Sequence, residues 1–182
     1  MPSSAIKQIN LNPGQRAERK LLITVAEWDE KLDGTTGTEQ VRELLGARTE
    51  DSSIEFNPDI QESTDILGNN YTDVNKTQPT QAFDPYLILG GSRLGAFLND
   101  IRRRNALSEL TGVFRIYIIT AFIGSSGSYE AERHSDCTIT YESMGGDANV
   151  NFPITVHFSN KITTGTVDKI AADFVFTQDT TL

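Results

Sequence analysis

The side chains best suited to bind a metal ion or to take part in catalysis are two histidines and a single cysteine. His134 and Cys137 stand three residues apart and form the one close pair of soft metal ligands. A structural zinc site needs four ligands at credible spacing, and the chain offers no second pair. His157 falls on the polar side of an alternating segment, where a solvated histidine is the ordinary interpretation. We therefore expect neither a metal site nor a cofactor.

Other polar segments match known binding or catalytic motifs only in part. Gly90-Gly91-Ser92 could present amides to an anion, but the other glycines of a dinucleotide loop and the lysine of a P-loop are missing. Residues 65–75, DILGNNYTDVN, carry oxygen ligands without the spacing or the final glutamate of a calcium loop. Glu130 and Glu132 share one strand face, as solvated acids commonly do. Nucleophile motifs such as G-x-S-x-G are absent, and we expect that the protein is not an enzyme.

Length and composition describe a chain that can fold without disulfides. Its 182 residues suffice for one domain. Of these residues 37% are hydrophobic, a lower fraction than is usual for a compact globular domain. One cysteine excludes an intramolecular disulfide framework and favours synthesis in a reducing cytoplasm. The N-terminus has no continuous apolar run, and residues 116–123 are too few to span a bilayer. We expect no membrane partner.

Charge is distributed unevenly along the chain. The net charge of −9 argues against tight nucleic-acid binding, which needs a basic surface. Residues 27–84 hold 14 Asp and Glu against 4 Lys and Arg, whereas residues 1–20 and 91–115 each carry a net charge of +3. Two interpretations remain open: an acidic, solubilising surface, or electrostatic complementarity between opposite faces of stacked copies.

Periodicity predicts a chain dominated by strands. Residues 21–28, LLITVAEW, are typical of a strand, with Leu22, Thr24 and Ala26 on one face and Leu21, Ile23 and Val25 on the other. Residues 113–124 are apolar on both faces, which indicates a strand covered on both sides. The expected strands cover residues 21–28, 40–49, 113–124, 129–144, 149–158 and 169–177.

One helix is expected at residues 92–107, where Leu94, Leu98 and Ile101 fall at helical spacing. Ser92 can cap its N-terminus, and three arginines near its C-terminus suit the macrodipole. We place this helix over one face of the 113–124 strand and a second sheet over the other. The expected fold is mainly β: two packed antiparallel sheets, sandwich or barrel-like, flanked by one α-helix.

Between residues 50 and 85 the chain is polar on both sides and poorly suited to burial. A structureless loop of this length is uncommon in a compact domain and tends to be functional or to order against another chain. We expect two edge-type strands, around residues 53–56 and 77–83, that form a protruding hairpin.

Several phrases of the sequence resemble the major tail proteins, the tail tube subunits, of long-tailed bacteriophages that infect Gram-positive bacteria. These are residues 46–91, GARTEDSSIEFNPDIQESTDILGNNYTDVNKTQPTQAFDPYLILGG, the strand FRIYIITAF, TITYESMGGD at 138–147 and ITTGTVDK at 162–169. The resemblance spans roughly residues 20–177.

The resemblance implies a single tail-tube β domain at residues 21–177, between an N-terminal arm at 1–20 and a C-terminal tail at 178–182. It implies hexameric rings of identical subunits that stack into a hollow tube, through which DNA passes without specific binding. Other tail proteins, such as the tape measure and the tail terminator, would be further partners. The protein would be made in the host bacterial cytoplasm and reside in the virion tail.

In that family the long loop bridges neighbouring subunits and rings, a role that falls here on about residues 50–83. Contact between this acidic loop and the basic arm or helix would fix the polarity of stacking. The candidate acidic contacts are Glu50, Asp51, Asp59, Glu62 and Asp65. The candidate basic contacts are Arg16, Arg19, Lys20, Arg102, Arg103 and Arg104.

Two alternatives stand beside this interpretation. The inner tube of a contractile tail or of a tail-derived bacteriocin would leave the character of the sequence nearly unchanged. A β-sandwich module that binds carbohydrate or a host surface is the alternative from a different class. Such modules often display an aromatic platform, and this chain has one tryptophan, Trp28.

Overall fold

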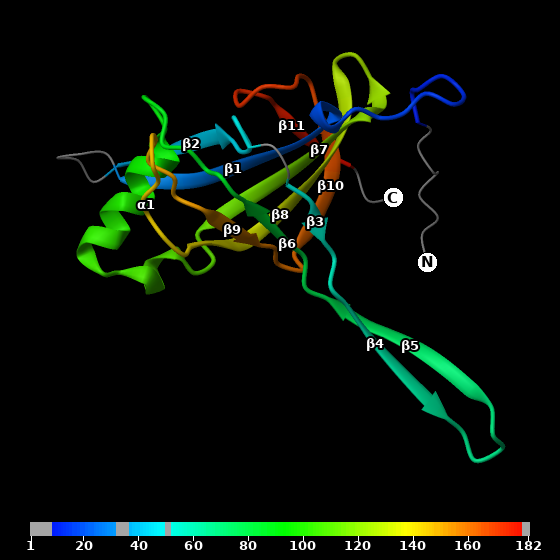
Figure 1. Ribbon diagram of the computed structural model, residues 1–182. Coiled ribbons are helices and arrows are strands. Elements are labelled where there is room, and N and C mark those ends of the chain that lie inside the picture. Colours follow the sequence, from blue (N-terminus) through cyan, green and yellow to red (C-terminus); the bar gives the residue numbers. More distant parts are fainter. Residues whose placement is uncertain (1–8, 32–36, 50–51, 180–182) are drawn as a thin grey trace.

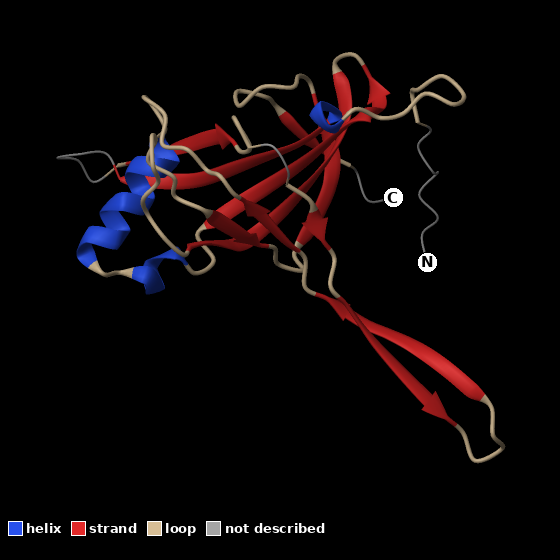
Figure 2. Cartoon of the chain, in the orientation of Figure 1, coloured by secondary structure: helices blue, strands red, loops and turns tan. Residues whose placement is uncertain are grey.

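The computed structural model describes residues 9–31, 37–49 and 52–179, and these residues form eleven strands and one α-helix (Figures 1 and 2). The strands are β1 (Leu22–Lys31), β2 (Thr38–Leu44), β3 (Ile54–Glu55), β4 (Pro58–Thr64), β5 (Asn70–Thr77), β6 (Thr80–Phe83), β7 (Phe114–Ser125), β8 (Ser128–Tyr141), β9 (Ile154–His157), β10 (Ile162–Val167) and β11 (Phe176–Gln178). The helix is α1 (Arg93–Arg104), and two 3-10 turns cover Arg19–Leu21 and Leu107–Leu110. The predicted mainly β fold with antiparallel sheets, one helix and a protruding hairpin is confirmed.

Nine strands form one antiparallel sheet in the order β2-β1-β7-β8-β9-β6-β3, with β10 paired to β8 and β11 paired to β10. β8 makes this sheet fold over on itself. Its residues 129–134 pair with β10 and its residues 138–141 pair with β9, while its other edge pairs with β7. The two halves of β8 meet at Asp136, whose φ of 56° interrupts the regular strand beside a register shift against β7. The β9-β6-β3 part therefore belongs to a second layer.

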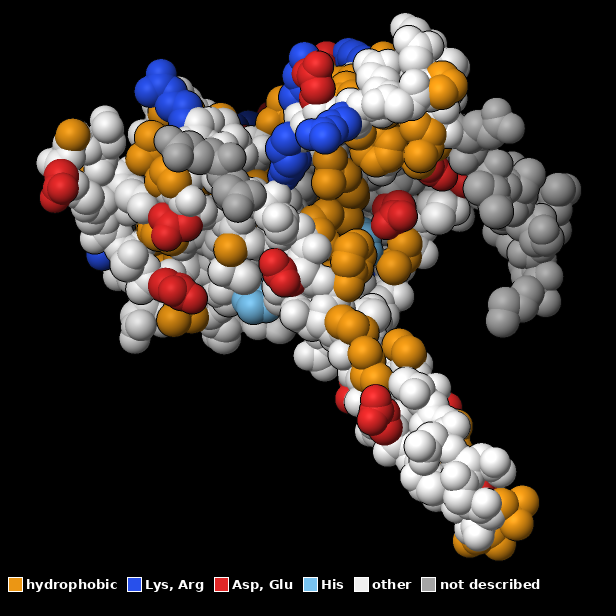
Figure 3. All heavy atoms as spheres, turned by 45° about the vertical axis from the view of Figure 1, so that its right-hand side comes forward, with side chains coloured by type: hydrophobic (Ala, Val, Ile, Leu, Met, Phe, Trp, Pro, Cys, Tyr) orange, Lys and Arg blue, Asp and Glu red, His pale blue; other side chains and the backbone are white. Residues whose placement is uncertain are grey.

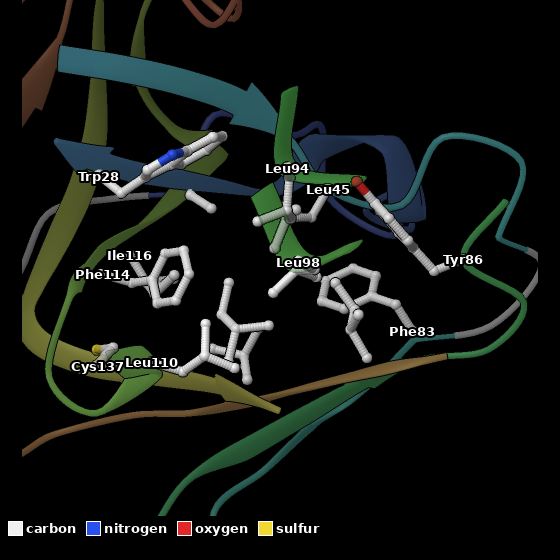
Figure 4. Close-up of a cluster of buried hydrophobic side chains, with 14 of the residues drawn as sticks. Trp28, Leu45, Phe83, Tyr86, Leu94, Leu98, Leu110, Phe114, Ile116 and Cys137 are labelled. Atoms are coloured by element: carbon white, nitrogen blue, oxygen red, sulfur yellow. The ribbon is translucent and has the colours of Figure 1, made fainter. Parts of the chain in front are cut away.

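The main core lies between the β1-β7-β8 layer on one side and both α1 and the β6-β9 layer on the other. Trp28 of β1 and Phe114 of β7 are fully buried, with ring centroids 6.1 Å apart. Leu94 and Leu98 of the helix and Phe83 of β6 close the cluster (Figure 4). The predicted apolar stripe of the helix is thus the face that packs on the sheet.

A smaller cluster covers the opposite face of the same strands. It joins Val25, Tyr117 and Ile119 to Phe174, which lies in the segment that follows β10. The prediction of a helix on one face and a second sheet on the other was therefore wrong in its placement, because helix and second layer share a face. Alternation shows which residues point the same way, but it does not show what covers them.

The first turn of α1 is held by a strand residue. Glu43 of β2 accepts hydrogen bonds from the backbone N–H groups of Arg93 and Leu94 at 2.9 and 3.0 Å. Ser92 caps the helix as predicted, since its Oγ accepts from the Gly95 N–H at 3.0 Å. The helix ends at Arg104, earlier than predicted, because Asn105 adopts the left-handed conformation with φ 53°.

Three predicted strands differ clearly from the observed ones. β2 ends at Leu44 and not at the predicted residue 49. β9 is limited to Ile154–His157 instead of residues 149–158. The predicted strand at 169–177 contains only the beginning of β11, and the true partner of β8, β10, was not predicted. β10 reads ITTGTV, with Gly165 opposite Ala131, so its small and polar residues give no apolar alternation. The alternation at 170–176 arises instead because Phe174, in the loop after β10, and Phe176, at the start of β11, both pack onto the sheet.

Candidate assembly surface

A two-stranded hairpin of β4 and β5 extends away from the body of the molecule (Figure 1). β4 and β5 pair only with each other, and every side chain of β4 is exposed. The predicted edge strands at 53–56 and 77–83 contain β3 and β6, which pair with each other. They form the root of the hairpin in the second layer, whereas the protruding part is built by residues 58–77 between them.

The root is fixed by hydrogen bonds that replace regular pairing. Asn57 adopts a φ of 44°, and its Nδ2 donates to the carbonyl of Gln78 at 3.1 Å. Below it, the buried Gln81 donates from Nε2 to Ser52 Oγ at 3.1 Å and accepts from Thr24 Oγ1 at 2.9 Å. The hairpin therefore leaves the body at a defined point.

The tip of the hairpin is an ordered turn organised by Asp65. Its Oδ1 accepts from the backbone N–H groups of Leu67 and Asn69 at 2.8 and 2.9 Å, and its Oδ2 accepts from Asn69 Nδ2 at 2.9 Å. The side-chain hydrogen bond from Asn69 is the main reason that the pKa of Asp65 lies below its ordinary value. The carboxylate that resembled a calcium ligand is thus engaged in holding the turn.

The hairpin of β4 and β5 carries exposed apolar side chains. Ile66 and Leu67 at the tip are 102% and 81% exposed, and Ile60 and Val74 face each other across the hairpin while being 56% and 62% exposed. Sequence reasoning concentrated on the acids and missed these anchors. The available signal was two consecutive large apolar residues inside an otherwise polar segment.

The predicted acidic contacts are found partly on the hairpin. Asp59 and Glu62 lie on β4 with exposed side chains, and Asp65 lies in the turn. Asp73 of β5 adds a further exposed acid. Glu50 and Asp51 lie outside the described residues. Acidic charge is therefore a property of the hairpin shaft.

The predicted basic contacts fall at two separate places. In the arm, Arg19 donates from Nη2 to the carbonyl of Ser52 at 2.7 Å, which brings the arm to the segment that leads into β3. Arg16 and Lys20 are exposed, and Lys20 pairs with Glu18 at 2.5 Å. The exposed arginines at the end of α1 lie at the other end of the body (Figure 1). These arginines are Arg102, Arg103 and Arg104.

Two of these three helix arginines, Arg102 and Arg104, have hydrogen-bond acceptors close by in the same molecule. Arg102 donates to Asn99 Oδ1 at 3.0 Å, and Arg104 pairs with Asp100 and Glu109, each at 2.8 Å. The structure thus joins the arm, and not the helix, to the root of the hairpin.

A groove of about 420 Å³ opens beside this root, between the β3-β6 layer and the layer of β7, β8 and β10. Its apolar lining consists of Leu22, Ile54, Phe56, Pro79, Ile118 and Ile162. Figure 3 shows apolar side chains running from beneath a group of Lys and Arg toward the base of the hairpin. Because these residues lie far apart in sequence, periodicity alone could not reveal the groove.

The residues first considered for chemistry have structural surroundings. Cys137 is buried, its Sγ lies 3.5 Å from the carbonyl oxygen of His134, and burial raises the pKa of its thiol. His134 Nδ1 lies 3.2 Å from the carbonyl oxygen of Ser159. At the Gly90-Gly91-Ser92 turn, the carboxylate of Glu43 occupies the position where a helix N-terminus would hold an anion.

The described part of the chain has neither a cluster of metal ligands nor a membrane-spanning helix. Within residues 9–31, 37–49 and 52–179, no three His, Cys, Asp or Glu side chains gather closely enough to hold a metal ion. No helix in these ranges has both the length and the apolar character needed to cross a membrane.

Comparison with known proteins gives little further information. No family model matches the chain, and no curated protein matches it. Among solved structures, the chain is similar to one from the cryo-EM structure of the anti-feeding prophage (AFP) baseplate, 6-fold symmetrised, with 10% identity and a TM-score of 0.48. The match covers 83% of this chain and 96% of that chain. A similarity of this degree assigns neither a family nor a function.

Proposed function

We propose that this protein is a structural subunit that assembles with copies of itself. The observation that carries the proposal is the hairpin of β4 and β5, which extends from the body with both strand edges unpaired and large apolar side chains exposed. An isolated two-stranded hairpin is at best marginally stable in water, and open strand edges promote association. A neighbouring copy that packs against the hairpin would remove both costs.

The form of assembly is proposed from the sequence resemblance described above. Subunits close into hexameric rings, and the rings stack into the hollow tail tube of a long-tailed bacteriophage. Heterologous contacts of this kind, in which different faces of identical subunits meet, close into rings or continue as filaments. DNA passes through the tube without specific binding, other tail proteins contact the tube ends, and the subunit performs no catalysis.

Electron microscopy of the purified protein over a range of concentrations tests the proposal. A matched variant replaces residues 58–77 by Asn-Gly, a two-residue hairpin turn that would join Asn57 to Gln78, which already lie side by side and continue the register of the pair Glu55↔Thr80. We expect rings or tubes from the natural sequence. We expect dispersed particles with unchanged thermal unfolding from the variant, because the deleted residues contribute nothing to either core cluster.

Dispersed monomers of the natural sequence at every concentration would contradict self-assembly. Tubes that form equally well from the shortened variant would show that the hairpin is not the assembly element.

A further inference from the structure

We propose that the apolar groove beside the hairpin root receives the hairpin tip of a second copy, with Ile66 and Leu67 as the inserted side chains. This inference rests on the proposed self-assembly and names the two surfaces that meet.

The groove has the properties of an unfilled binding site. It is the open end of the space between the two layers, and its volume of about 420 Å³ lies within the range of roughly 300–1,000 Å³ that is typical of occupied pockets. Ile118 at its floor is 8% exposed, whereas Phe56 and Ile162 at its rim are 63% and 52% exposed. Apolar side chains that line a recess in this way gain free energy when a partner excludes water from them.

The tip is suited to fill such a recess. Ile66 and Leu67 are among the most exposed large apolar residues of the described chain, and they stand next to each other on one turn. The hydrogen bonds of Asp65 fix the backbone of that turn before binding. An anchor whose backbone is already ordered loses less conformational entropy when it binds.

The hairpin cannot place its tip in its own groove. Its root lies at the groove, since Phe56 and Thr77 line it, and the strands then carry the tip away from the body (Figures 1 and 3). β4 and β5 pair without interruption from Ile60↔Val74 to Thr64↔Asn70, and again at Pro58↔Thr77 beyond a register shift, so the tip is held at the far end of a paired ribbon. A hairpin tip that fills this groove therefore comes from another molecule.

Charge favours a second copy of this chain as that molecule. Residues 58–77 carry four Asp and Glu against one Lys, whereas Arg19 lines the groove and Arg16 and Lys20 are exposed on the adjoining arm. Glu132 also lies in the groove, beside His134. With the tip inserted, the acidic shaft of one copy would approach the basic arm of the other, which orients the contact.

Cysteine cross-linking between two different variants tests this contact. Protein with Ile66→Cys is mixed with protein with Ile162→Cys, assembled, and oxidised. The matched control replaces the second partner by Val175→Cys, a position 63% exposed on the segment that covers the other face of the sheet. The natural Cys137 stays in all variants because it is buried.

A mixed disulfide dimer should form several times faster in the Ile66–Ile162 mixture than in the control mixture. Equal yields from assembled material would overturn the groove as the receptor while leaving self-assembly intact. Failure of the natural sequence to assemble at all would overturn the proposed function and this inference together.

A second measurement compares assembly thresholds. Ile66→Ser with Leu67→Ser should raise the protein concentration needed for assembly about tenfold or more, because two apolar anchors are lost. The control pair Ile60→Ser with Val74→Ser removes two exposed apolar side chains from the hairpin shaft and leaves the tip unchanged. An equal effect of both pairs would show that the tip has no special role.

Discussion

At the scale of single residues, Glu43 connects the helix to the sheet. Its carboxylate accepts from two helix N–H groups, and the hydroxyl groups of Tyr86 and Ser92 also donate to it, each at 2.8 Å. A negative charge at a helix N-terminus is favourable, and buried donors that lose their acceptor are costly. Glu43 therefore fixes the first turn of α1 to the sheet, in addition to the apolar packing of Leu94 and Leu98.

We expect Glu43→Gln to lower the free energy of unfolding by about 2 kcal/mol, because the charge is lost and at least one donor is left without a good acceptor. Urea denaturation followed by circular dichroism measures the change. Glu39→Gln on the same strand is the control, since Glu39 is half exposed and pairs with Arg93 at the surface. Its effect should stay below about 1 kcal/mol. Equal losses would contradict the role of Glu43 as an anchor.

Asp65 gives the hairpin tip a dependence on pH. Its folded-state pKa is lowered, chiefly by the hydrogen bond from Asn69, so the ionised carboxylate stabilises the turn above the ordinary value of 3.8. This stabilisation is lost as the pH falls through the lower, folded-state pKa. The backbone N–H signals of Leu67 and Asn69 in an NMR titration should therefore change with a midpoint below pH 3.8. A midpoint at or above that value would contradict the turn structure.

At the scale of elements, the segment after β10 covers the face of β1 and β7 that lies opposite α1. Phe174 is 2% exposed, its ring lies 4.8 Å from Tyr117, and the Arg42 guanidinium lies 4.4 Å from its centroid. The same face carries the buried Glu27, which is paired with Arg42 and Arg115. A short irregular segment thereby shields both an apolar cluster and a buried carboxylate from water.

Phe174→Ala should cost about 3 kcal/mol in the free energy of unfolding, because a large buried side chain is removed and the cavity can only partly close. The neighbouring Val175→Ala, at a position 63% exposed, should change it by less than about 0.5 kcal/mol. Urea midpoints with an unchanged slope provide the comparison. A small effect of Phe174→Ala would mean that the segment does not cover the sheet as described.

At the scale of the whole molecule, the body and the hairpin have separate roles. The body has two apolar clusters and folds around them, whereas residues 58–77 of the hairpin contribute no side chain to either cluster. Changes to the acidic shaft should therefore act on association and spare folding.

Reversing charge with Asp59→Lys and Glu62→Lys should raise the assembly concentration about tenfold at low salt and much less at high salt, because surface charge contacts are screened. Light scattering against protein concentration at two salt concentrations measures this. Glu142→Lys with Asp147→Lys makes the same change in net charge on an exposed loop of the body. Equal effects would indicate that net charge, and not the hairpin, controls association.

The sequence by itself determined the elements whose signal is local. The apolar runs at 21–28 and 113–124 predicted β1 and β7, helical spacing and Ser92 predicted the start of α1, and the polar run between residues 50 and 85 predicted a protruding hairpin. These features depend on neighbours two to four residues apart, which is the range that periodicity reports. The fold class follows from them.

Only the tertiary structure decided how these elements share their faces. β10 has no apolar alternation and is fixed by its pairing with β8, while Phe174 covers a sheet face from a segment that alternates like a strand. The groove joins Leu22, Ile118 and Ile162, and the first and last of these lie 140 residues apart in the sequence. Contacts at such separations are set by packing and strand register, so no local pattern in the sequence could specify them.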